Sequence, residues 1–287
     1  MLLLSLVLAH LIADFYLQTD KMVVDKMKNI TKHIGHHFLV NILVLTVFYL
    51  FLSEEVSIVT SLIFPLLFIV SSHFIIDILK IRLLDTLKIS SEENVKRASF
   101  FTIDQLLHLG IILLAGQFFL GVKLAGIHEF FLNGKELGTI NSVLFILIVL
   151  ILATSVSGHM IKILLGSLPN QLLTFEGKYT FKNERQEAQY AMNHKGNRAL
   201  TEEYNYTIFS KHDLSRGKLI GYIERLLVIL LTFYSAYPAI GFIVAAKSIA
   251  RFKQMDDRNW AEYFLLGTLT SMFLGITLGI LLREVLT

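Results

Sequence analysis

Three pairs of His and Asp, each with a spacing of four residues, lie in segments that are otherwise apolar. The pairs are His10 with Asp14, His73 with Asp77, and Asp104 with His108. On an α-helix this spacing places both side chains of a pair on one face, one turn apart. Ionisable side chains within hydrocarbon are costly and normally face a bundle interior, where they mark a function. Because imidazole and carboxylate groups are common zinc ligands, the pairs predict a metal site.

The composition fits a membrane protein. Hydrophobic residues make up 54% of the 287 residues and charged residues only 17%, whereas a soluble domain has about 25% charged residues. The mean hydropathy is +0.61. The chain has no Cys, so disulfides and thiolate ligands are excluded and any metal ligand is a His, Asp, Glu or amide. A net charge of +3 gives no case for nucleic acid as a partner.

The apolar segments predict an all-α fold, a polytopic transmembrane helix bundle with about seven or eight spans. A span needs about 20 apolar residues. The first predicted span is short, and the seventh is short enough to be a re-entrant helix packed inside the bundle. The predicted spans are residues 1–18, 36–53, 57–79, 99–121, 140–165, 218–235, 239–252 and 260–283.

Basic residues predict the orientation. Lys and Arg concentrate in every second connection between the spans, which places those connections in the cytoplasm and the N-terminus outside. The chain then divides into an N-terminal transmembrane bundle (1–165), a cytoplasmic polar helical segment (166–217) and C-terminal transmembrane helices (218–287). Residues 169–217 form the only long polar stretch, which we interpret as an amphipathic or surface helix pair.

The topology orders the pairs by depth. Spans one and three run inward with His before Asp, whereas span four runs outward with Asp before His. In all three helices the Asp therefore lies nearer the cytoplasm and the His about 6 Å deeper. His37, four residues after His33, falls near the deeper layer. We expect spans one, three and four, together with span two, to be neighbours whose His and Asp faces converge on the cytoplasmic half of the bundle.

A divalent ion, zinc by its ligand chemistry, is the cofactor that such a site predicts. Gln18 and Gln105 lie beside the pairs and would orient the ligand carboxylates. An Asp that is not fully engaged with the metal would accept a proton, so Asp14, Asp77 and Asp104 are the candidate catalytic residues. The candidate ligands are His10, Asp14, His37, His73, Asp77, Asp104 and His108.

Simpler interpretations stay open for the individual residues. A single membrane His or Asp is often a packing hydrogen bond between helices, and Asp104 also suits a helix N-terminus. Either Gln can reach the headgroups instead. For His33 and His36 we expect solvation at the interface, and for His159 a packing role.

A second polar group lies in the last three spans. Lys247 and Arg251 predict an anion clamp for a lipid phosphate or carboxylate. The alternative, which we favour, is a network with Glu224, Arg225 and Glu262 that stabilises the bundle.

The motifs resemble a known family. HLIADFYLQTD, HHFLV, HFIIDILK and FTIDQLLHL are similar to the bacterial integral-membrane family called domain of unknown function 3307, and later segments such as GKLIGYIERLLVILL resemble its longer members. The resemblance implies a multi-pass protein of the bacterial cytoplasmic (inner) membrane and implies no reaction. The family motifs fall on His10, Asp14, Gln18, His37, His73, Asp77, Asp104, Gln105 and His108.

Three functions agree with these observations. The first is a metal-dependent hydrolase that acts on a lipid-like substrate in the bilayer, because a bound ion activates water at neutral pH. The second is a proton- or metal-coupled transporter or channel, because buried His and Asp form proton relays. The third is a non-enzymatic membrane component that recruits a cytoplasmic protein through residues 169–217.

Overall fold

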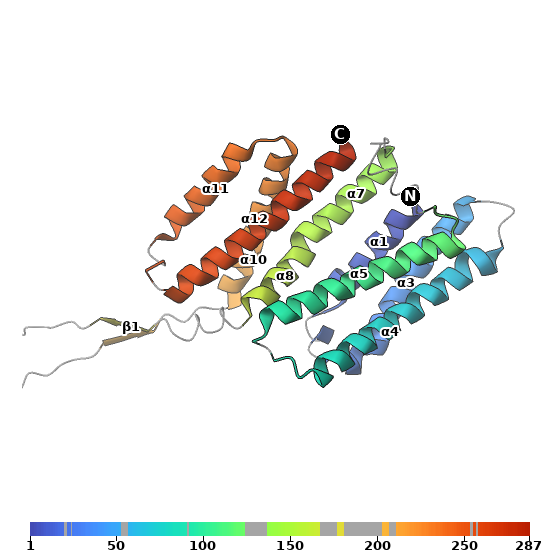
Figure 1. Ribbon diagram of the computed structural model, residues 1–287, viewed down its shortest axis with the longest axis horizontal. Helices are drawn as coiled ribbons and strands as arrows, with labels where there is room; N and C mark the ends of the chain where they lie inside the picture. The colour runs from blue at the N-terminus through green and yellow to red at the C-terminus, as the bar shows by residue number, and fades with distance from the viewer. Residues whose placement is uncertain are drawn as a thin grey trace, which may run out of the picture.

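The computed structural model is built from long helices (Figure 1). It describes residues 1–19, 22–23, 25–52, 57–90, 92–123, 137–166, 177–180, 203–206, 211–252, 255–256 and 258–287. Within these residues, five helices are long and apolar enough to cross a membrane, and two shorter apolar helices span Leu2–Leu17 and Tyr237–Ala250. This agrees with the predicted all-α membrane bundle. The orientation of the N-terminus stays a prediction.

Four helical elements of the N-terminal half form a closed bundle. They are α1 (Leu2–Ile12), α3 (Lys26–Leu52), α4 (Phe64–Thr86) and α5 (Asn94–Phe119). The contacts run from α1 to α3, from α3 to α4, from α4 to α5 and from α5 back to α1. Two π-helical turns extend these helices, η1 (Ala13–Leu17) after α1 and η2 (Val59–Ile63) before α4. A single enclosed interior therefore receives side chains from all four helices.

The interior of this bundle has an apolar half and a polar half. Buried aliphatic side chains fill the half that contains the start of α1. This apolar core comprises Leu2, Leu6, Leu45, Leu66, Ile69, Ile112 and Ala115. The buried polar side chains lie at the other end of the same four helices, after the apolar core in α1 and α4 and before it in α3 and α5. The apolar core thus closes one end of the interior and leaves the other end to the His and Asp residues.

A long rod joins this bundle to the C-terminal helices. It consists of α7 (Thr139–Ile151), the π-helical turn η3 (Leu152–Val156) and α8 (Ser157–Leu165), and it packs against α1 and α5 on one side. On its other side lie α10 (Lys211–Phe233) and α12 (Arg258–Leu286), while α11 (Tyr237–Ala250) contacts α10 at the edge of the molecule (Figure 1).

α10 and α12 pack closely together, and small residues make this approach possible. A Cβ atom added at Gly279 would lie 2.6 Å from the Thr232 Cβ, and one added at Gly275 would lie 2.9 Å from a Val228 methyl group. Two glycines four residues apart let membrane helices approach closely. They fix α12 against α10 at the level where Arg225 is buried.

The polar segment differs from the predicted helix pair where the structure describes it. β1 (Gly177–Thr180) and β2 (Glu203–Tyr206) pair as an antiparallel ladder, and α10 already begins at Lys211. The strand sequences GKYT and EYNY contain aromatic and β-branched residues, which favour a sheet over a helix. The prediction of helices is wrong for these eight residues. The rest of 167–210 lies outside the described residues.

Candidate metal centre

The three predicted pairs converge in the polar half of the four-helix bundle. His10 comes from α1, Asp14 from η1, and the other two pairs from α4 and α5. Two imidazoles of α3 complete the cluster. The residues of the cluster have exposed fractions of at most 6%, except Asp14, whose side chain is 10% exposed. The cluster comprises His10, Asp14, His33, His37, His73, Asp77, Asp104 and His108.

Local helix geometry explains how each element presents its residues. His33 and His37 of α3, and His73 and Asp77 of α4, are one turn apart on one face. Asp14 lies in the π-helical turn η1, which ends where Gln18 adopts an extended conformation. Single π-helical turns occur frequently at functional sites because the extra residue redirects a side chain. Here the turn carries the carboxylate that contacts three of the helices.

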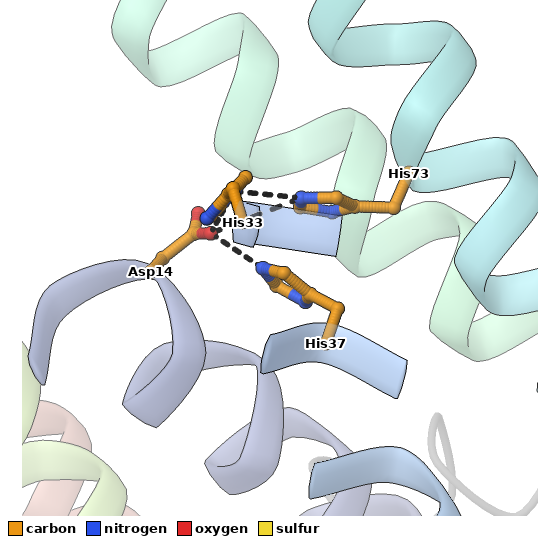
Figure 2. Close-up of side chains that lie close together, drawn as sticks. All are labelled: Asp14, His33, His37 and His73. Carbon is orange, nitrogen blue, oxygen red and sulfur yellow. Dashed lines mark hydrogen bonds and ion pairs between the residues drawn. The ribbon is translucent and has the colours of Figure 1, made fainter. Parts of the chain in front are cut away.

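One carboxylate oxygen and three ring nitrogens meet at one point (Figure 2). Asp14 Oδ1 lies 2.9 Å from His37 Nε2, 3.4 Å from His33 Nε2 and 3.9 Å from His73 Nε2. The Nε2 atoms of His33 and His73 are 3.2 Å apart. Ligand atoms at about 2.0–2.1 Å from a tetrahedral zinc ion lie about 3.3 Å from one another. The four separations given above lie around this value, and all four ligand atoms lie within 4.8 Å of one another.

The second oxygen of Asp14 faces other residues. Its Oδ2 lies 3.6 Å from His10 Nε2 and accepts a hydrogen bond of 3.0 Å from the Gln105 amide. His10, Asp14 and His108 also offer ligand atoms within 4.8 Å of one another, as do His73, Asp77 and His108. The Gln105 amide thus donates to Asp14 on a different helix and, at 3.5 Å, to Oδ2 of the adjacent Asp104. Its role in orienting ligand carboxylates stays a prediction.

Two lysines complete the polar half, and the sequence analysis missed both. Lys26 Nζ lies 2.6 Å from Asp77 Oδ1, and Lys80 Nζ lies 2.6 Å from Asp104 Oδ2. Their spacing along the helices could have assigned both lysines to the cluster. Lys26 lies two turns before His33 on α3, and Lys80 lies one turn after Asp77 on α4. The relation between Lys26 and His33 was missed because the second span was predicted to start at residue 36, after both residues.

His33 lies inside the cluster and not at the membrane interface, so the prediction for it is wrong. We expected solvation at the interface, but its exposed fraction is 1% and its Nε2 contacts both Asp14 and Asp77. The reason is that α3 begins at Lys26, ten residues before the predicted span, so His33 lies well inside the helix. His36 is partly buried and belongs to none of the metal-binding groups found among the described residues.

Two other predicted residues lie outside the cluster. The buried Nε2 of Gln18 donates no hydrogen bond to any residue that the structure describes. The predicted hydrogen bond from Gln18 to the Asp14 carboxylate is therefore not observed. His159 packs its ring against Phe15 and Phe101, with centroid distances of 6.3 and 5.0 Å. This is the packing role that the sequence analysis expected.

The second polar group forms partners of its own. Lys247 Nζ lies 2.6 Å from Glu224 Oε2, and the buried Arg225 donates from Nε to the Ala153 carbonyl oxygen at 2.6 Å and from an Nη to Ser271 Oγ at 3.3 Å. Glu262 pairs with Arg258 at 2.9 Å on an exposed stretch of α12. Glu224, Lys247 and Arg251 also line a groove of about 360 Å³ between α10 and α11. The anion clamp stays a prediction.

Comparison with known families identifies the part that carries the cluster. A family model described as "Protein of unknown function (DUF3307)" matches residues 2–132. The matched region contains the whole four-helix bundle and every residue of the cluster. It ends before α7, so the resemblance expected for the C-terminal segments is not part of this match. No curated protein and no solved structure matches the chain.

Proposed function

We propose that this protein is a metal-dependent hydrolase of the bacterial cytoplasmic membrane, and that its His/Asp cluster binds a divalent ion of the zinc class. The observation that carries the proposal is the convergence of three ring nitrogens on one carboxylate oxygen, with all four ligand atoms within 4.8 Å of one another. Asp14, His33, His37 and His73 would hold this first ion, and hydrolysis would need a water molecule at a fifth position on it.

The geometry of the imidazoles supports a cation rather than hydrogen bonds alone. Each ring directs Nε2 at the same carboxylate oxygen, and two of these nitrogens lie 3.2 Å from each other. Unprotonated nitrogens that face one another repel through their lone pairs, and one proton relieves only one such pair. A divalent ion accepts all four lone pairs at once, and neutral imidazole is the form that binds metals.

The net charge of the cluster also supports the binding of a divalent ion. The cluster contains three carboxylates, of Asp14, Asp77 and Asp104, and two ammonium groups, of Lys26 and Lys80. With neutral imidazoles its net charge is −1, which is costly inside a membrane bundle. One divalent ion changes the net charge to +1, and a hydroxide bound to that ion brings it to zero. The site therefore favours the deprotonated form of metal-bound water.

A hydroxide on such an ion would be the nucleophile for hydrolysis. A bound divalent ion lowers the pKa of its water to about 7. Asp77 Oδ2 lies 3.4 Å from His33 Nε2 and makes no hydrogen bond to any described residue, while Lys26 holds the other oxygen. We assign Asp77 as the group that accepts the proton of the water. With an ion bound, the site would supply a hydroxide that attacks the ester carbon or phosphorus; as the ester C–O or P–O bond broke, Asp77 would pass the proton to the leaving alkoxide.

The surroundings of the cluster support a membrane-associated substrate. The four helices expose large apolar side chains outward, among them Leu39, Leu43, Phe74 and Leu106. The cluster itself lies towards the ends of the helices that carry Lys26 and Lys80. A lipid-like molecule with its ester group near the bilayer surface could reach this depth laterally.

The fold favours a hydrolase over a transporter or channel. A transport route needs polar groups or water along the whole bundle. Beyond the cluster the described interior is filled by the apolar core around Leu6, Leu45 and Ile112, whose exposed fractions are 0–2%. The recruitment of a cytoplasmic protein through 169–217 stays a prediction, because most of that segment lies outside the described residues.

Metal content tests the proposal with a matched pair of variants. We expect purified protein in detergent to contain at least one divalent ion per chain by elemental analysis. His37→Gln should lose it, whereas His36→Gln, one residue away on α3 and outside the metal-binding groups, should retain it. Hydrolysis of ester and phosphoester lipids in proteoliposomes should follow the metal content. A metal-free protein whose thermal midpoint does not change with chelator would overturn the proposal.

A further inference from the structure

The cluster has more ligands than one ion can use, and these are arranged around a second point. We propose a second divalent-cation position bounded by His10, Asp14 and His108, so that the Asp14 carboxylate bridges two ions. This inference rests on the proposed function, because the first ion occupies the other side of the same carboxylate. It adds a binding site and narrows the class of substrate.

The two oxygens of Asp14 are divided between two groups of imidazoles. Oδ1 faces His33, His37 and His73, at 3.4, 2.9 and 3.9 Å. Oδ2 faces His10, at 3.6 Å. A carboxylate that served one ion would not need imidazoles at both oxygens. A carboxylate between two ions about 3.5–4 Å apart does, and such pairs of ions act together in hydrolytic sites.

The ring nitrogens on the second side have no hydrogen-bond partner. His10 Nε2 and both ring nitrogens of His108 lie buried without one among the described residues, and the exposed fractions of the two residues are 6% and 2%. Buried polar atoms are almost always paired, so unpaired ones point to a missing ion or water. The two rings lie 5.1 Å apart by their centroids. Both are close enough to Asp14 to ligate one ion with it.

An alternative group for a second ion is less well placed. His73, Asp77 and His108 also lie within ligand distance of one another. However, His73 is already a ligand of the first ion, and Lys26 neutralises Asp77 at 2.6 Å. His10 and His108 compete with neither. Gln105 can keep its hydrogen bond to Asp14 Oδ2, because a carboxylate oxygen accepts more than one interaction.

Binding of two ions changes the net charge of the site, and therefore the substrate charge that the site favours. The cluster has a net charge of −1 when its imidazoles are neutral, so two divalent ions and one shared hydroxide leave it at +2. A buried site of this charge is best matched by a dianion. A phosphate monoester carries about two negative charges at neutral pH, whereas a carboxylic ester carries none at the reacting group. From this charge we infer that the substrates are phosphate monoesters with a lipid-like leaving group.

Cobalt titration of the full-length protein tests the second position. Metal-free protein in detergent is titrated with Co²⁺, and bound metal is measured by visible absorbance and by elemental analysis. We expect two equivalents for the unmodified chain and for His36→Gln, and one for His10→Gln and for His108→Gln. The EPR signal per bound cobalt should fall when the second equivalent binds, because a bridging carboxylate couples the two spins. The single-site variants should lack this fall.

Each outcome separates the two proposals. One equivalent in the unmodified chain, unchanged in His10→Gln and lost in His37→Gln, would overturn the second position and leave the first intact. No bound cobalt at all would overturn both. Two uncoupled equivalents, or two equivalents that persist in both His10→Gln and His108→Gln, would place the second ion elsewhere and overturn the assignment. Faster hydrolysis of carboxylic esters than of phosphate monoesters would overturn the substrate class.

Discussion

Within the described residues, the polar group around Arg225 and the His/Asp cluster differ in how well their buried atoms are paired. In the C-terminal helices Arg225 donates to the Ala153 carbonyl oxygen and to Ser271, and Lys247 pairs with Glu224. In the four-helix bundle, His10, Asp77, Asp104 and His108 each contain at least one buried atom without a hydrogen-bond partner among the described residues. A paired group connects helices, whereas an unpaired group is available to bind.

The energetic consequences of the two arrangements are opposite. An unmade hydrogen bond at a buried polar atom costs about 1–3 kcal/mol, so the His/Asp cluster destabilises the bundle until a ligand binds. The Arg225 group contributes stability without any ligand, because it connects α10, η3 and α12. The cluster is therefore the region whose stability should depend on metal, and the Arg225 group should be insensitive to it.

The largest effect should come from Asp14→Asn. The amide is almost isosteric, but it loses the negative charge that faces four imidazoles. We expect loss of all bound metal and of detectable hydrolysis, measured by elemental analysis and by turnover in proteoliposomes. Asp25→Asn, at an exposed carboxylate that pairs with Lys28, is the control and should change neither. An Asp14→Asn protein that keeps its metal would remove the distinction between the two regions.

Lys26→Met should have the next largest effect, on stability. It leaves Asp77, whose side chain is 1% exposed, without its countercharge. Breaking a buried ion pair from one side costs about 3–5 kcal/mol, so the thermal midpoint of the metal-free protein should fall markedly. The double variant Lys26→Met/Asp77→Asn should recover most of the loss, and Lys28→Met, at a side chain that is 81% exposed, should cause none. If the double variant is as unstable as the single one, the pair does not act as a countercharge.

Arg225→Met tests the other region. It leaves the Ala153 carbonyl oxygen without its 2.6 Å hydrogen bond inside the helix contact, and an unsatisfied buried acceptor costs about 1–3 kcal/mol. The expected result is a lower thermal midpoint with unchanged metal content and turnover. Lys218→Met, at the exposed start of α10, is the control. Loss of metal in Arg225→Met would show that the two regions depend on each other.

The predicted spans and the three His/Asp pairs were accessible from the sequence because both depend on local spacing. Apolar runs place the helices, and a spacing of four residues places two side chains on one face. His33, Lys26 and Lys80 were not assigned to the cluster, because hydropathy cannot show how far a helix continues into a polar stretch. α3 begins at Lys26, and only the structure shows that its first turns line the bundle.

The pairing of β1 with β2 had no local signal of the same kind. Gly177 pairs with Tyr206 across a long stretch of chain, and such a pairing depends on contacts that no window of helix or strand spacing contains. Which residues of different helices meet was also inaccessible from spacing alone. The bond from Gln105 of α5 to Asp14 of η1 is an example, because the sequence placed Gln105 beside Asp104 and gave no reason to connect it with another helix.

The smallest effect should come from an ion pair at the surface, and it sets the baseline for the others. Glu93 precedes α5 and accepts hydrogen bonds from the Ser90 backbone N–H at 3.0 Å and from Lys96. These donors favour the charged form, with Lys96 contributing most, and lower the pKa of the Glu93 carboxyl. The carboxylate therefore adds stability above the usual pKa of Glu, and this contribution is lost as the pH falls through the lowered value.

Glu93→Gln should thus lower the thermal midpoint slightly at neutral pH and not at all in acid. Exposed pairs are screened by solvent and contribute little, so the shift should be far smaller than that of Lys26→Met. Thermal unfolding of both variants at neutral and acid pH measures the difference. Similar shifts for the two lysine–carboxylate pairs would mean that burial in the four-helix bundle does not strengthen Lys26–Asp77, and the contrast between buried and exposed charge in this protein would be lost.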